Sequence, residues 1–429
     1  MNVKALQRAD RWLGVPLCFV LTLARRLLER KPPRTVPPPR SILFVKLAEQ
    51  GSTVLAWPAL RRAVEMVGRE HVYFLVLEEN RFILDVLNVI PAENVIALRG
   101  QNVRTLARNA LGAIRKLRAL RLDAALDLEF FSRGSAALTF LSGARWRVGF
   151  HAWFGGGPYR GDLMTHRLVY NPHLHTSDAF LSLVEALSQP PEQLPAFDWP
   201  ARSHSQTPSP GVRHEPPTFA PDPVELESVR GILRAVGART PLILLNPNAS
   251  DLLPLRRWPP ERYVELARRL LDAYPELTVG FTGSPAETAA TQELVKRVNS
   301  PRCVSLAGRT SLRELLVLYT LAEVLVTNDS GPAHFATLTP IHVITLFGPE
   351  TPRLFAARSP RNTVLWAGLA CSPCVSAYNN RQSACRNNLC MQAIPVETVF
   401  AEVCRAYEAR RAARPTDGAA AGAASTGPQ

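Results

Sequence analysis

Two features of membrane-spanning and secreted proteins are missing from the start of the sequence. Residues 11–26 contain an apolar run of about twelve residues, whereas a helix that spans a bilayer needs about 20. The same segment lacks the small-residue cleavage site of a secretory signal. We therefore expect the protein to stay in the cytoplasm.

Signatures of nucleic-acid binding are also missing, although the chain is strongly basic. The formal net charge is +14, and residues 1–40 carry nine Lys and Arg against Asp10 and Glu29. A basic chain usually binds nucleic acid, an anionic membrane or an anionic substrate. Because the sequence has no zinc-finger, RNA-binding or helix-turn-helix signature, we expect no nucleic-acid partner.

The basic N-terminal segment has two interpretations. Arginines flank its apolar run and Trp12 stands at one end, which favours a peripheral position on an anionic membrane surface. The alternative is a helix that packs on the protein's own surface. Both interpretations remain open from the sequence.

Length and composition indicate two domains. A chain of 429 residues with 46% hydrophobic residues is long enough for two cores. Proline-rich stretches divide it. We predict a basic amphipathic segment with a Pro-rich linker at 1–40, a first domain at 41–188, a Pro-rich interdomain connection at 189–240, a second domain at 241–412 and a disordered Ala- and Gly-rich tail at 413–429.

Strands and helices are predicted to alternate in both domains. In the first domain we predict strands at 41–46, 72–77, 94–98, 122–128 and 147–150, with helices at 53–67, 81–87, 103–120 and 133–141. In the second we predict strands at 242–245, 278–282, 304–306, 324–326 and 342–346, with helices at 261–274, 286–298, 312–321 and 396–412. Such alternation predicts Rossmann-like α/β domains, each with a parallel sheet covered on both faces.

The most informative stretch is residues 324–338, where a buried strand turns into a helix. The strand ends in Thr-Asn-Asp-Ser, which are turn and N-cap residues, and Pro332 suits a first helical position. Gly331 lets a ligand approach the backbone, the helix dipole favours an anion, and His334 adds a side-chain donor. An ordinary capped βα turn is the simpler interpretation, but capping alone does not require Ser, Gly and His together.

A second glycine- and proline-containing turn, residues 347–352, follows the next predicted strand. Since the carboxyl ends of parallel strands meet at one edge of a sheet, the two turns should lie side by side. Together they favour a cradle for a diphosphate.

The motif Asn-Asp-Ser-Gly-Pro-Ala-His at residues 328–334, followed by a strand and Leu-Phe-Gly-Pro-Glu-Thr at 346–351, resembles the nucleotide-sugar signature of glycosyltransferase family nine. These are the ADP-heptose:lipopolysaccharide heptosyltransferases, and a weaker resemblance runs from about residue 41 to 403. The resemblance implies a GT-B fold, in which two Rossmann-like domains face each other across a cleft. It also implies inverting transfer of a heptose from a nucleotide-diphosphate sugar to a lipid-linked saccharide, with no cofactor required.

The same resemblance implies a set of donor-binding residues in the second domain. Arg256 stands where the family usually has a phosphate-binding Lys, and it can supply the same charge with a bidentate fork. Glu287 matches a ribose-binding Glu, although a carboxylate in a first helical turn is also favoured by the dipole. The full predicted set is Asn248, Arg256, Glu287, Arg309, Asp329, Ser330, Gly331 and His334.

The catalytic base is where the sequence departs from the family pattern. The family's first loop typically reads Gly-Asp, but here Gly51 is followed by Ser52, which has no useful basicity near neutral pH. Glu49, in the same loop, is our candidate replacement. The alternatives are Asp127, His175 or a protein that binds its ligand without catalysis.

Two loops are candidates for the acceptor side. His175 matches an acceptor-side His of the family, although a loop His is more often a cap or a surface residue. The glycine run at 155–161 superficially resembles a dinucleotide fingerprint. Its Pro and the weak strand before it favour a mobile acceptor loop instead.

Four of the seven cysteines are clustered in sequence. The spacing of Cys371, Cys374, Cys385 and Cys390 permits a tetrahedral structural zinc site, which suits a reducing cytosol better than disulfides. Free thiols are the alternative. We expect the other three, Cys18, Cys303 and Cys404, to be packed inside the protein.

Three functions remain compatible with these patterns. The first is the sugar transfer that the resemblance implies. The missing Asp motivates a second, a non-catalytic nucleotide-sugar-binding protein of a surface-polysaccharide pathway. The third is a GT-B sugar epimerase, which would consume its donor without an acceptor.

Overall fold

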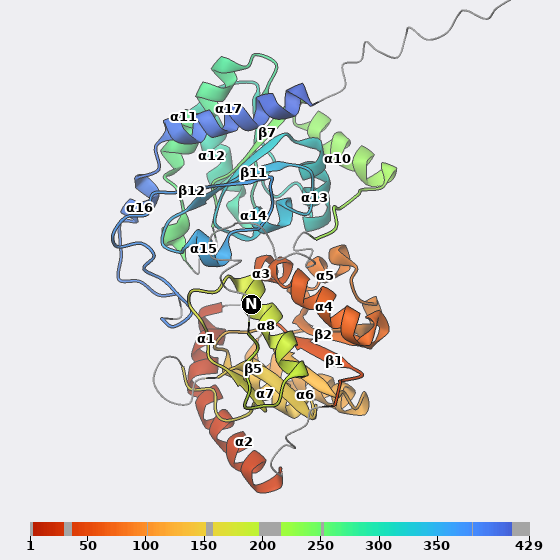
Figure 1. The fold of residues 1–429 in the computed structure, drawn as a ribbon. Coiled ribbons are helices and arrows are strands. Elements are labelled where there is room, and N and C mark those ends of the chain that lie inside the picture. The colour runs from red at the N-terminus through yellow and green to blue at the C-terminus, as the bar shows by residue number, and fades with distance from the viewer. Residues whose placement is uncertain are drawn as a thin grey trace, which may run out of the picture.

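The computed structural model describes residues 3–29, 37–100, 102–151, 158–196, 216–249, 253–379 and 381–413. These residues form two α/β halves, one above the other in Figure 1. The predicted tail beyond residue 413 and the glycines at 155–157 lie outside the described residues.

The first half contains a six-stranded parallel sheet. Its strands are β1 (Ile42–Val45), β2 (Val72–Leu77), β3 (Val95–Leu98), β4 (Ala124–Asp127), β5 (Trp146–Phe150) and β6 (His166–Leu168). Its helices are α1 (Val3–Trp12), α2 (Gly14–Leu28), α3 (Gln50–Leu55), α4 (Trp57–Val67), α5 (Phe82–Leu87), α6 (Val103–Ala119), α7 (Arg133–Leu141) and α8 (Thr176–Glu185). The strand order is β3-β2-β1-β4-β5-β6.

The second half contains another six-stranded parallel sheet. Its strands are β7 (Leu242–Asn246), β8 (Thr278–Phe281), β9 (Cys303–Ser305), β10 (Val324–Asn328), β11 (His342–Phe347) and β12 (Asn362–Trp366). Its helices are α10 (Pro223–Ala235), α11 (Pro260–Ala273), α12 (Thr288–Val298), α13 (Leu312–Leu321), α14 (Gly331–Ala336), α15 (Pro352–Phe355), α16 (Leu389–Gln392) and α17 (Val396–Ala412). The strand order is β12-β11-β10-β7-β8-β9.

The two sheets have the same topology when strands are counted within each half. In both, the first and fourth strands are hydrogen-bonded neighbours in the middle of the sheet: β1 with β4, and β7 with β10. The order of strands reverses at this point, and ligands of open parallel sheets bind beside such a switch point. The fold therefore marks the loops after these four strands as the place for a site.

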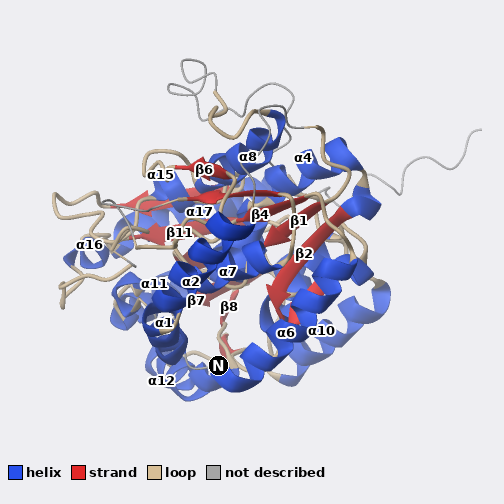
Figure 2. Cartoon of the chain, turned by 90° about the horizontal axis from the view of Figure 1, so that it is seen from below, coloured by secondary structure: helices blue, strands red, loops and turns tan. Residues whose placement is uncertain are grey.

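Alternating side chains of the central strands pack under helices on opposite faces. In β1, Ile42 and Phe44 join a core with α4 and α8, whereas Leu43 and Val45 join a core with α6 and α7. Figure 2 shows strands and helices of this half from below. In the second half, α10, α13 and α14 cover one face, and α11 and α17 cover the other. The predicted parallel sheets with both faces covered are present.

Several elements differ from the sequence prediction. The predicted helix at 53–67 begins earlier and is divided at Ala56 into α3 and α4, before Pro58. Strands β6 and β12 were not predicted. Part of the predicted interdomain connection, 189–240, is helix α10, whose start is capped reciprocally by Asp222 and Glu225.

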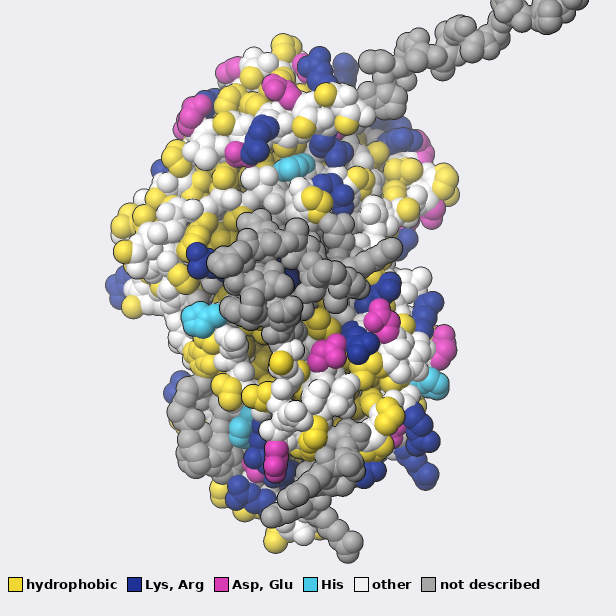
Figure 3. Space-filling view, viewed as in Figure 1, with side chains coloured by type: hydrophobic (Ala, Val, Ile, Leu, Met, Phe, Trp, Pro, Cys, Tyr) yellow, Lys and Arg dark blue, Asp and Glu magenta, His cyan; other side chains and the backbone are white. Residues whose placement is uncertain are grey.

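The N-terminal segment forms two helices, and within the described ranges no helix is both long enough and apolar enough to cross a membrane. On the face seen in Figure 3, Lys and Arg side chains are spread over both halves, with apolar side chains between them. The positive charge on this face is therefore distributed and has no single centre.

Candidate functional site

The loops at the carboxyl ends of the two sheets meet between the halves. Helix α3 of the first half contacts α14 of the second, and the two are neighbours in Figure 1. A methyl group built on Gly51 would lie 2.7 Å from Cδ2 of His334 and 3.5 Å from Cα of Gly331. Only glycine therefore allows this close approach, which brings the predicted catalytic loop onto the predicted phosphate turn.

The side chain of Asn328 holds the turn between β10 and α14. Its Oδ1 accepts hydrogen bonds from Trp258 N (3.0 Å) and Tyr263 Oη (3.2 Å). Its Nδ2 donates to the carbonyls of Pro247 (3.0 Å) and Asn248 (3.1 Å). All four hydrogen-bonding positions of this buried amide are used. It thereby joins the loop after β10 to the loop after β7.

His334 lies in the short helix that follows this turn and is 8% exposed. Its Nδ1 is buried and has no hydrogen-bond partner within the described ranges of the chain. Burial, reinforced by the charge of Arg256, lowers the pKa of His334 to about 4. The imidazole is therefore neutral near pH 7 and can donate one hydrogen bond to an anion.

Arg256 reaches the same turn from the loop after β7. Its Nη1 lies 3.8 Å from Asp329 Oδ2 and 3.5 Å from Glu350 Oε2. Its Nε is buried without a hydrogen-bond partner in the part of the chain that the structure describes. This guanidinium consequently keeps an unused donor beside the turn, as a binding site for an anionic ligand requires.

The two carboxyl groups beside Arg256 repel each other. Asp329 and Glu350 are both buried. Burial, followed by the nearby Glu350 carboxylate, raises the pKa of Asp329 far above its ordinary range, although Arg256 and Arg381 oppose the shift. Near neutral pH the Asp329 carboxyl therefore favours its protonated form.

A second group of predicted donor residues lies at the ends of β7 and β8. Asn248 Nδ2 donates to Thr282 O at 3.3 Å, and Glu287 Oε2 accepts from Ser284 N at 2.7 Å. A methyl group on Gly283 would lie 2.8 Å from Asn248 Nδ2 and 3.2 Å from Glu287 Oε2. The structure therefore brings these two predicted residues together around a close-packed glycine.

The turn that carries Arg309 lies next to this glycine. Gly308 N donates to Gly283 O at 2.9 Å, and Arg309 itself is exposed. Arg309 is thus located at the same sheet edge as Asn248 and Glu287, with its side chain toward solvent.

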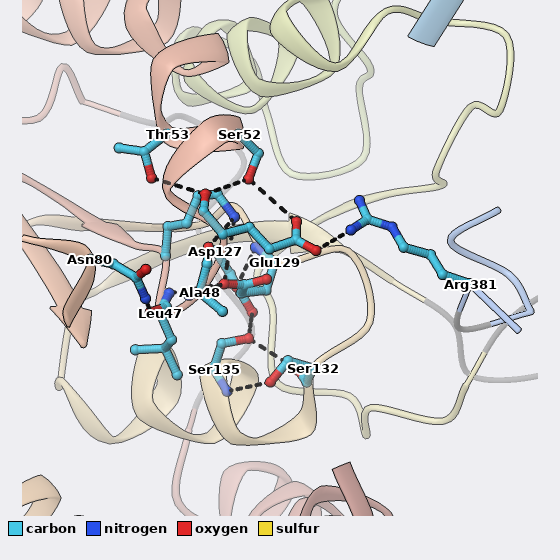
Figure 4. Close-up of polar contacts among 12 residues, drawn as sticks. Leu47, Ala48, Ser52, Thr53, Asn80, Asp127, Glu129, Ser132, Ser135 and Arg381 are labelled. Atoms are coloured by element: carbon cyan, nitrogen blue, oxygen red, sulfur yellow. Dashed lines mark hydrogen bonds and ion pairs between the residues drawn. The ribbon is translucent and has the colours of Figure 1, made fainter. Parts of the chain in front are cut away.

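Buried charges fix the first loop of the other half, as Figure 4 shows. Glu129 Oε1 accepts from Leu47 N (2.9 Å) and Ala48 N (3.0 Å) and lies 3.6 Å from Lys46 Nζ. Lys46 is only 2% exposed and also donates to Ala48 O at 2.9 Å. Asn80 Nδ2 donates to Leu47 O at 2.8 Å. The backbone that leads into Glu49 is therefore held from three sides.

Glu49 itself bridges toward the second half. Its backbone is in the left-handed region (φ 67°), which is unfavourable for a residue other than glycine. Its Oε1 pairs with Nη1 of Arg381, and the Nε of that arginine lies 3.1 Å from Glu350 Oε1. Burial alone would raise the pKa of Glu49, but Arg381 and then Lys46 and Arg256 outweigh it and lower the pKa to about 2.

Ser52 has a local role in the same loop. Its hydroxyl donates to Glu49 O at 2.9 Å and lies 3.4 Å from Glu49 Oε2. Among the predicted catalytic residues, Glu49 is the one with a carboxylate at the interface. The part that either side chain takes in catalysis stays a prediction.

The alternative bases have other partners. Asp127 is fully buried, accepts from Ser135 Oγ at 3.0 Å and pairs with Arg160. Burial, despite Arg160, raises its pKa to about 6. Asp127 thus belongs to the interior of the first half.

His175 is the N-cap of α8 and uses both ring nitrogens. Its Nδ1 accepts from Ser177 N at 3.1 Å, so its Nε2 donates to Ala356 O of the second half at 2.9 Å. Burial lowers the pKa of His175 to about 3. The predicted acceptor-side residue therefore caps a helix and joins the halves in this structure.

The predicted zinc ligands are not gathered into a ligand set. Cys371 and Cys385 are exposed, Cys374 is half-buried and Cys390 is buried, and all four are free. No group of three His, Cys, Asp or Glu side chains that could hold a metal ion occurs in the described ranges. The structure gives no support for zinc and leaves the free-thiol alternative. Of the cysteines expected to be packed, Cys18 and Cys303 are buried and Cys404 is half-buried.

Three charged residues of the site were missed from the sequence: Lys46, Glu350 and Arg381. A readable signal existed for Glu350, because it lies in the second glycine- and proline-containing turn. Lys46 ends a predicted strand, where a buried Lys is uncommon. Arg381 lies in a segment without periodic hydrophobicity, so no sequence signal indicated it.

Comparison with known proteins gives one family. The family model described as glycosyltransferase family 9 (heptosyltransferase) matches residues 111–384. Lipopolysaccharide heptosyltransferase 2 of Salmonella typhimurium is 32% identical over 121 residues, which is 28% of this chain and 34% of that protein. The lipopolysaccharide core heptosyltransferase OpsX of Haemophilus influenzae is 22% identical over 323 residues, 73% of this chain and 80% of that protein. The matched region thus spans about a third of the first of these relatives.

Solved structures share the fold. ADP-heptose lipopolysaccharide heptosyltransferase II of E. coli has a TM-score of 0.65 at 19% identity and covers 86% of this chain and 99% of that one. The E. coli heptosyltransferase WaaC, solved with ADP-2-deoxy-2-fluoro heptose, has a TM-score of 0.56 at 16% identity, with 85% and 99% covered. The predicted GT-B fold with two Rossmann-like halves is confirmed.

Proposed function

We propose, from the premise that the chain belongs to glycosyltransferase family 9, that it transfers a heptose from an ADP-sugar to a lipopolysaccharide core or a related lipid-linked saccharide. The observation that carries the proposal is a pair of buried nitrogens beside the β10–α14 turn, Nε of Arg256 and Nδ1 of His334, which have no hydrogen-bond partner among the described residues. A buried polar atom without a partner needs an explanation, and two such nitrogens on cationic or imidazole side chains beside one turn are explained by an anionic ligand. A diphosphate would supply both a charge for Arg256 and an acceptor for His334.

The ADP moiety is supported by two kinds of observation. WaaC, which shares the fold, has been solved with ADP. In this chain, Asn248, Glu287 and the turn of Arg309 lie at the ends of β7, β8 and β9, along the same edge as the phosphate turn. We place the ribose and the base of the donor toward these strands.

In the proposed transfer, Glu49 is the base. The acceptor hydroxyl oxygen attacks C1 of the donor sugar, and a new C1–O bond forms with inversion. The bond between C1 and the phosphate oxygen breaks, and ADP leaves with the bonding electrons. The acceptor proton moves to the Glu49 carboxylate and then to solvent. Arg256 and neutral His334 stabilise the charge that develops on the leaving diphosphate.

The decisive experiment measures ADP release by the purified chain with a truncated lipopolysaccharide acceptor. We expect release only with acceptor, and a loss of at least about a hundredfold in Glu49→Gln with donor binding retained. In the Glu49→Gln background, Ser52→Asp restores the carboxylate of the family pattern and should recover part of the rate. Release by Glu49→Gln at the native rate would remove Glu49 from the mechanism.

The same assay separates the alternatives. Donor binding without release in the presence of acceptor would support a non-catalytic binding protein, which the missing Asp and the pairing of Glu49 with Arg381 favour. Donor consumption without acceptor would support an epimerase.

We also propose that α2 rests on an anionic bilayer, where the acceptor is located. One face of the helix is fixed to the first half: Thr22 Oγ1 accepts from Asp162 N at 2.8 Å, and Arg25 Nη2 lies 2.5 Å from Asp162 Oδ2. A methyl group on Gly14 would lie 2.7 Å from Arg133 Cβ. These contacts orient the helix on the protein.

The opposite face of α2 and the residues before it are apolar and exposed. The exposed large side chains are Trp12 (74%), Leu13 (64%), Leu17 (42%), Phe19 (52%), Val20 (59%), Leu23 (45%), Leu27 (85%) and Leu28 (83%). Arg11 and Arg26 are exposed at the two ends of this stretch, and Arg30 and Lys31 follow in the sequence. An apolar stripe between basic residues fits the headgroup boundary of an anionic bilayer. In this proposal, one face of α2 packs on the protein's own surface and the opposite face contacts the membrane, so the two interpretations of the sequence are compatible.

Sedimentation with lipid vesicles tests this contact. The chain should bind vesicles that contain anionic lipid more tightly than neutral vesicles, and Phe19→Glu with Leu23→Glu should weaken binding at least about tenfold. Leu111→Glu, at a 59% exposed position of α6, is the matched control. Equal binding by the double variant and the native chain would remove α2 from the contact.

A further inference from the structure

One guanidinium joins the two halves across the candidate site. Arg381 lies between β12 and α16, on the segment that carries the four clustered cysteines. Its Nη1 pairs with Glu49 Oε1, after β1, and its Nε lies 3.1 Å from Glu350 Oε1, after β11. These contacts place Arg381 directly between the predicted base and the turn that follows the second half's phosphate loop.

The same place is where the donor diphosphate is expected. Glu350 uses its other oxygen, Oε2, toward Arg256 Nη1 at 3.5 Å, so one carboxylate lies between the two arginines. Gly51, two residues after Glu49, contacts the β10–α14 turn. A diphosphate at that turn would therefore lie close to both guanidiniums. Phosphate oxygens match the arginine fork and carry more charge than one carboxylate.

The pairing has a consequence for Glu49. Its carboxylate faces Arg381, Lys46, Arg256 and the ring of His334, with the Ser52 hydroxyl at 3.4 Å. Of the charged groups, Arg381 makes the direct ion pair. A carboxylate held in its charged form by a cation is a weak base. While this pair persists, Glu49 is poorly suited to take the proton of an acceptor hydroxyl.

We propose that Arg381 exchanges partners when the donor binds: the diphosphate replaces Glu49 on the guanidinium, and the freed carboxylate turns to the acceptor hydroxyl. This inference rests on the proposed function. The exchange itself makes and breaks only hydrogen bonds and ion pairs, and the proton moves to Glu49 afterwards. Arg381 is then both a donor ligand and the residue that keeps the base inactive until the donor is present.

The first test is ADP affinity, measured by calorimetry on the full chain. Arg381→Gln should weaken ADP binding about tenfold to a hundredfold, because one charged hydrogen-bonding partner is lost. Arg386→Gln, which removes the same charge from an exposed position of the same segment, should stay within about twofold. Arg381→Lys keeps the charge without the fork and should recover only part of the affinity.

The second test is the pH dependence of turnover with the donor as varied substrate. The acidic limb of kcat/KM reports the free enzyme, and that of kcat reports the loaded enzyme. For the native chain we expect the acidic limb of kcat to lie at higher pH than that of kcat/KM, because the Glu49 carboxylate no longer pairs with Arg381 in the loaded enzyme. In Arg381→Gln the acidic limb of kcat/KM should shift to higher pH until it coincides with the acidic limb of kcat. A purely structural role of Arg381 would not produce this shift.

The outcomes separate this inference from the proposed function. If the native chain does not bind ADP, both fail. If it binds ADP and Arg381→Gln binds ADP equally well, the exchange is wrong and the proposed function stands. A gap between the two acidic limbs that persists unchanged in Arg381→Gln also overturns it. Circular dichroism on Arg381→Lys and Arg381→Gln identifies any loss caused by unfolding.

Discussion

The two halves share a strand order but hold their switch-point loops by different means. In the first half, these loops are held by ion pairs: Asp127 with Arg160, both buried, and the buried Lys46 with the half-buried Glu129. In the second half, the equivalent loops after β7 and β10 are held by neutral amides. Asn328 makes four hydrogen bonds, and Asn246 Oδ1 accepts from Asn248 N at 3.1 Å.

The difference matches the chemistry that each half is proposed to perform. A loop that positions a base needs charged neighbours to tune a carboxylate, even though burying ions costs desolvation. A loop that receives a diphosphate needs a fixed backbone and fixed donors, and a satisfied amide network holds that backbone while Arg256 lies beside Asp329 and Glu350. The ionic half should therefore respond strongly to lost partners and to pH, and the amide half mainly to lost hydrogen bonds.

The largest effect should follow from removing Arg160. This arginine is 2% exposed, pairs with Asp127, and donates to Phe150 O (2.7 Å) and Ser132 O (2.9 Å). Arg160→Met leaves a buried carboxylate without its cation and should lower the free energy of unfolding by about 3–5 kcal/mol. Urea denaturation near pH 7.5 measures this. At pH 5 the loss should be smaller, because Asp127 then takes up a proton.

Arg115→Met, at an exposed position of α6, is the control and should change stability by less than about 0.5 kcal/mol. A loss below about 1 kcal/mol in Arg160→Met would mean that the first half does not depend on this ion pair.

Removing the amide of Asn328 should have the next largest effect. Asn328→Ala leaves Trp258 N–H and the carbonyls of Pro247 and Asn248 without their partner, and we expect a loss of about 2–4 kcal/mol. ADP affinity should fall as well, since the two loops separate. Unlike the loss in Arg160→Met, the stability loss should be the same at pH 5 and pH 7.5. A clear pH dependence would contradict the neutral character of this amide network.

The native chain should also show the ionic character of its first half directly. The pKa of Asp127 is raised to about 6 by burial, which outweighs the attraction of Arg160, whereas an unfolded Asp titrates near pH 3.9. Between these values the folded state binds more protons at this carboxyl, so the contribution of Asp127 to stability falls as pH rises from about 4 through 6. The lowered pKa values of His175 and His334 act in the opposite direction. The fall from Asp127 is about 2–3 kcal/mol.

Asp127→Asn removes that titration, so its unfolding free energy should gain more between pH 4.5 and 7 than that of the native chain, by about 2–3 kcal/mol. The other carboxyl groups and the histidines titrate alike in both proteins, and the difference between the two curves therefore isolates Asp127. Parallel curves would show that Asp127 is charged at little cost in the fold.

The amide half was the more predictable from sequence. Strand ends fix which side chains reach the edge of a parallel sheet, so the turn after β10 and the positions of most predicted donor residues along this edge could be located in advance. Helix α10 was not predicted because it lies inside a proline-rich stretch, although Asp222 and Glu225 have the spacing of a capping box. Strand β12 is only half-buried along its length, so it lacks the apolar run by which buried strands are recognised.

The ionic half was less predictable, because its partners are far apart in the chain. Glu49 and Arg381 are 332 residues apart, and Asp127 and Arg160 are 33 apart. Neither spacing follows a helix or strand period, so no local pattern relates the two members of a pair. The loop after β1 could be identified from the sequence as a candidate site, whereas the cation that pairs with its carboxylate could be identified only from the folded chain.

The smallest predicted effect separates the ribose from the phosphates in the amide half. Glu287 Oε2 caps its own turn by accepting from Ser284 N at 2.7 Å, and Gln can accept the same bond. Glu287→Gln should therefore change the unfolding free energy by less than about 0.5 kcal/mol. If its carboxylate binds the donor ribose, ADP affinity should drop about threefold to tenfold, because a hydrogen bond to a charged acceptor becomes a neutral one.

Inorganic pyrophosphate, which has no ribose, supplies the matched measurement. Its affinity should be unchanged in Glu287→Gln and reduced in Arg256→Gln, whereas ADP affinity should fall in both. Equal ADP affinity in Glu287→Gln and the native chain would mean that Glu287 only caps its turn. The donor would then be held by its phosphates and by the loop after β7, and the end of β8 would serve only to shape that loop.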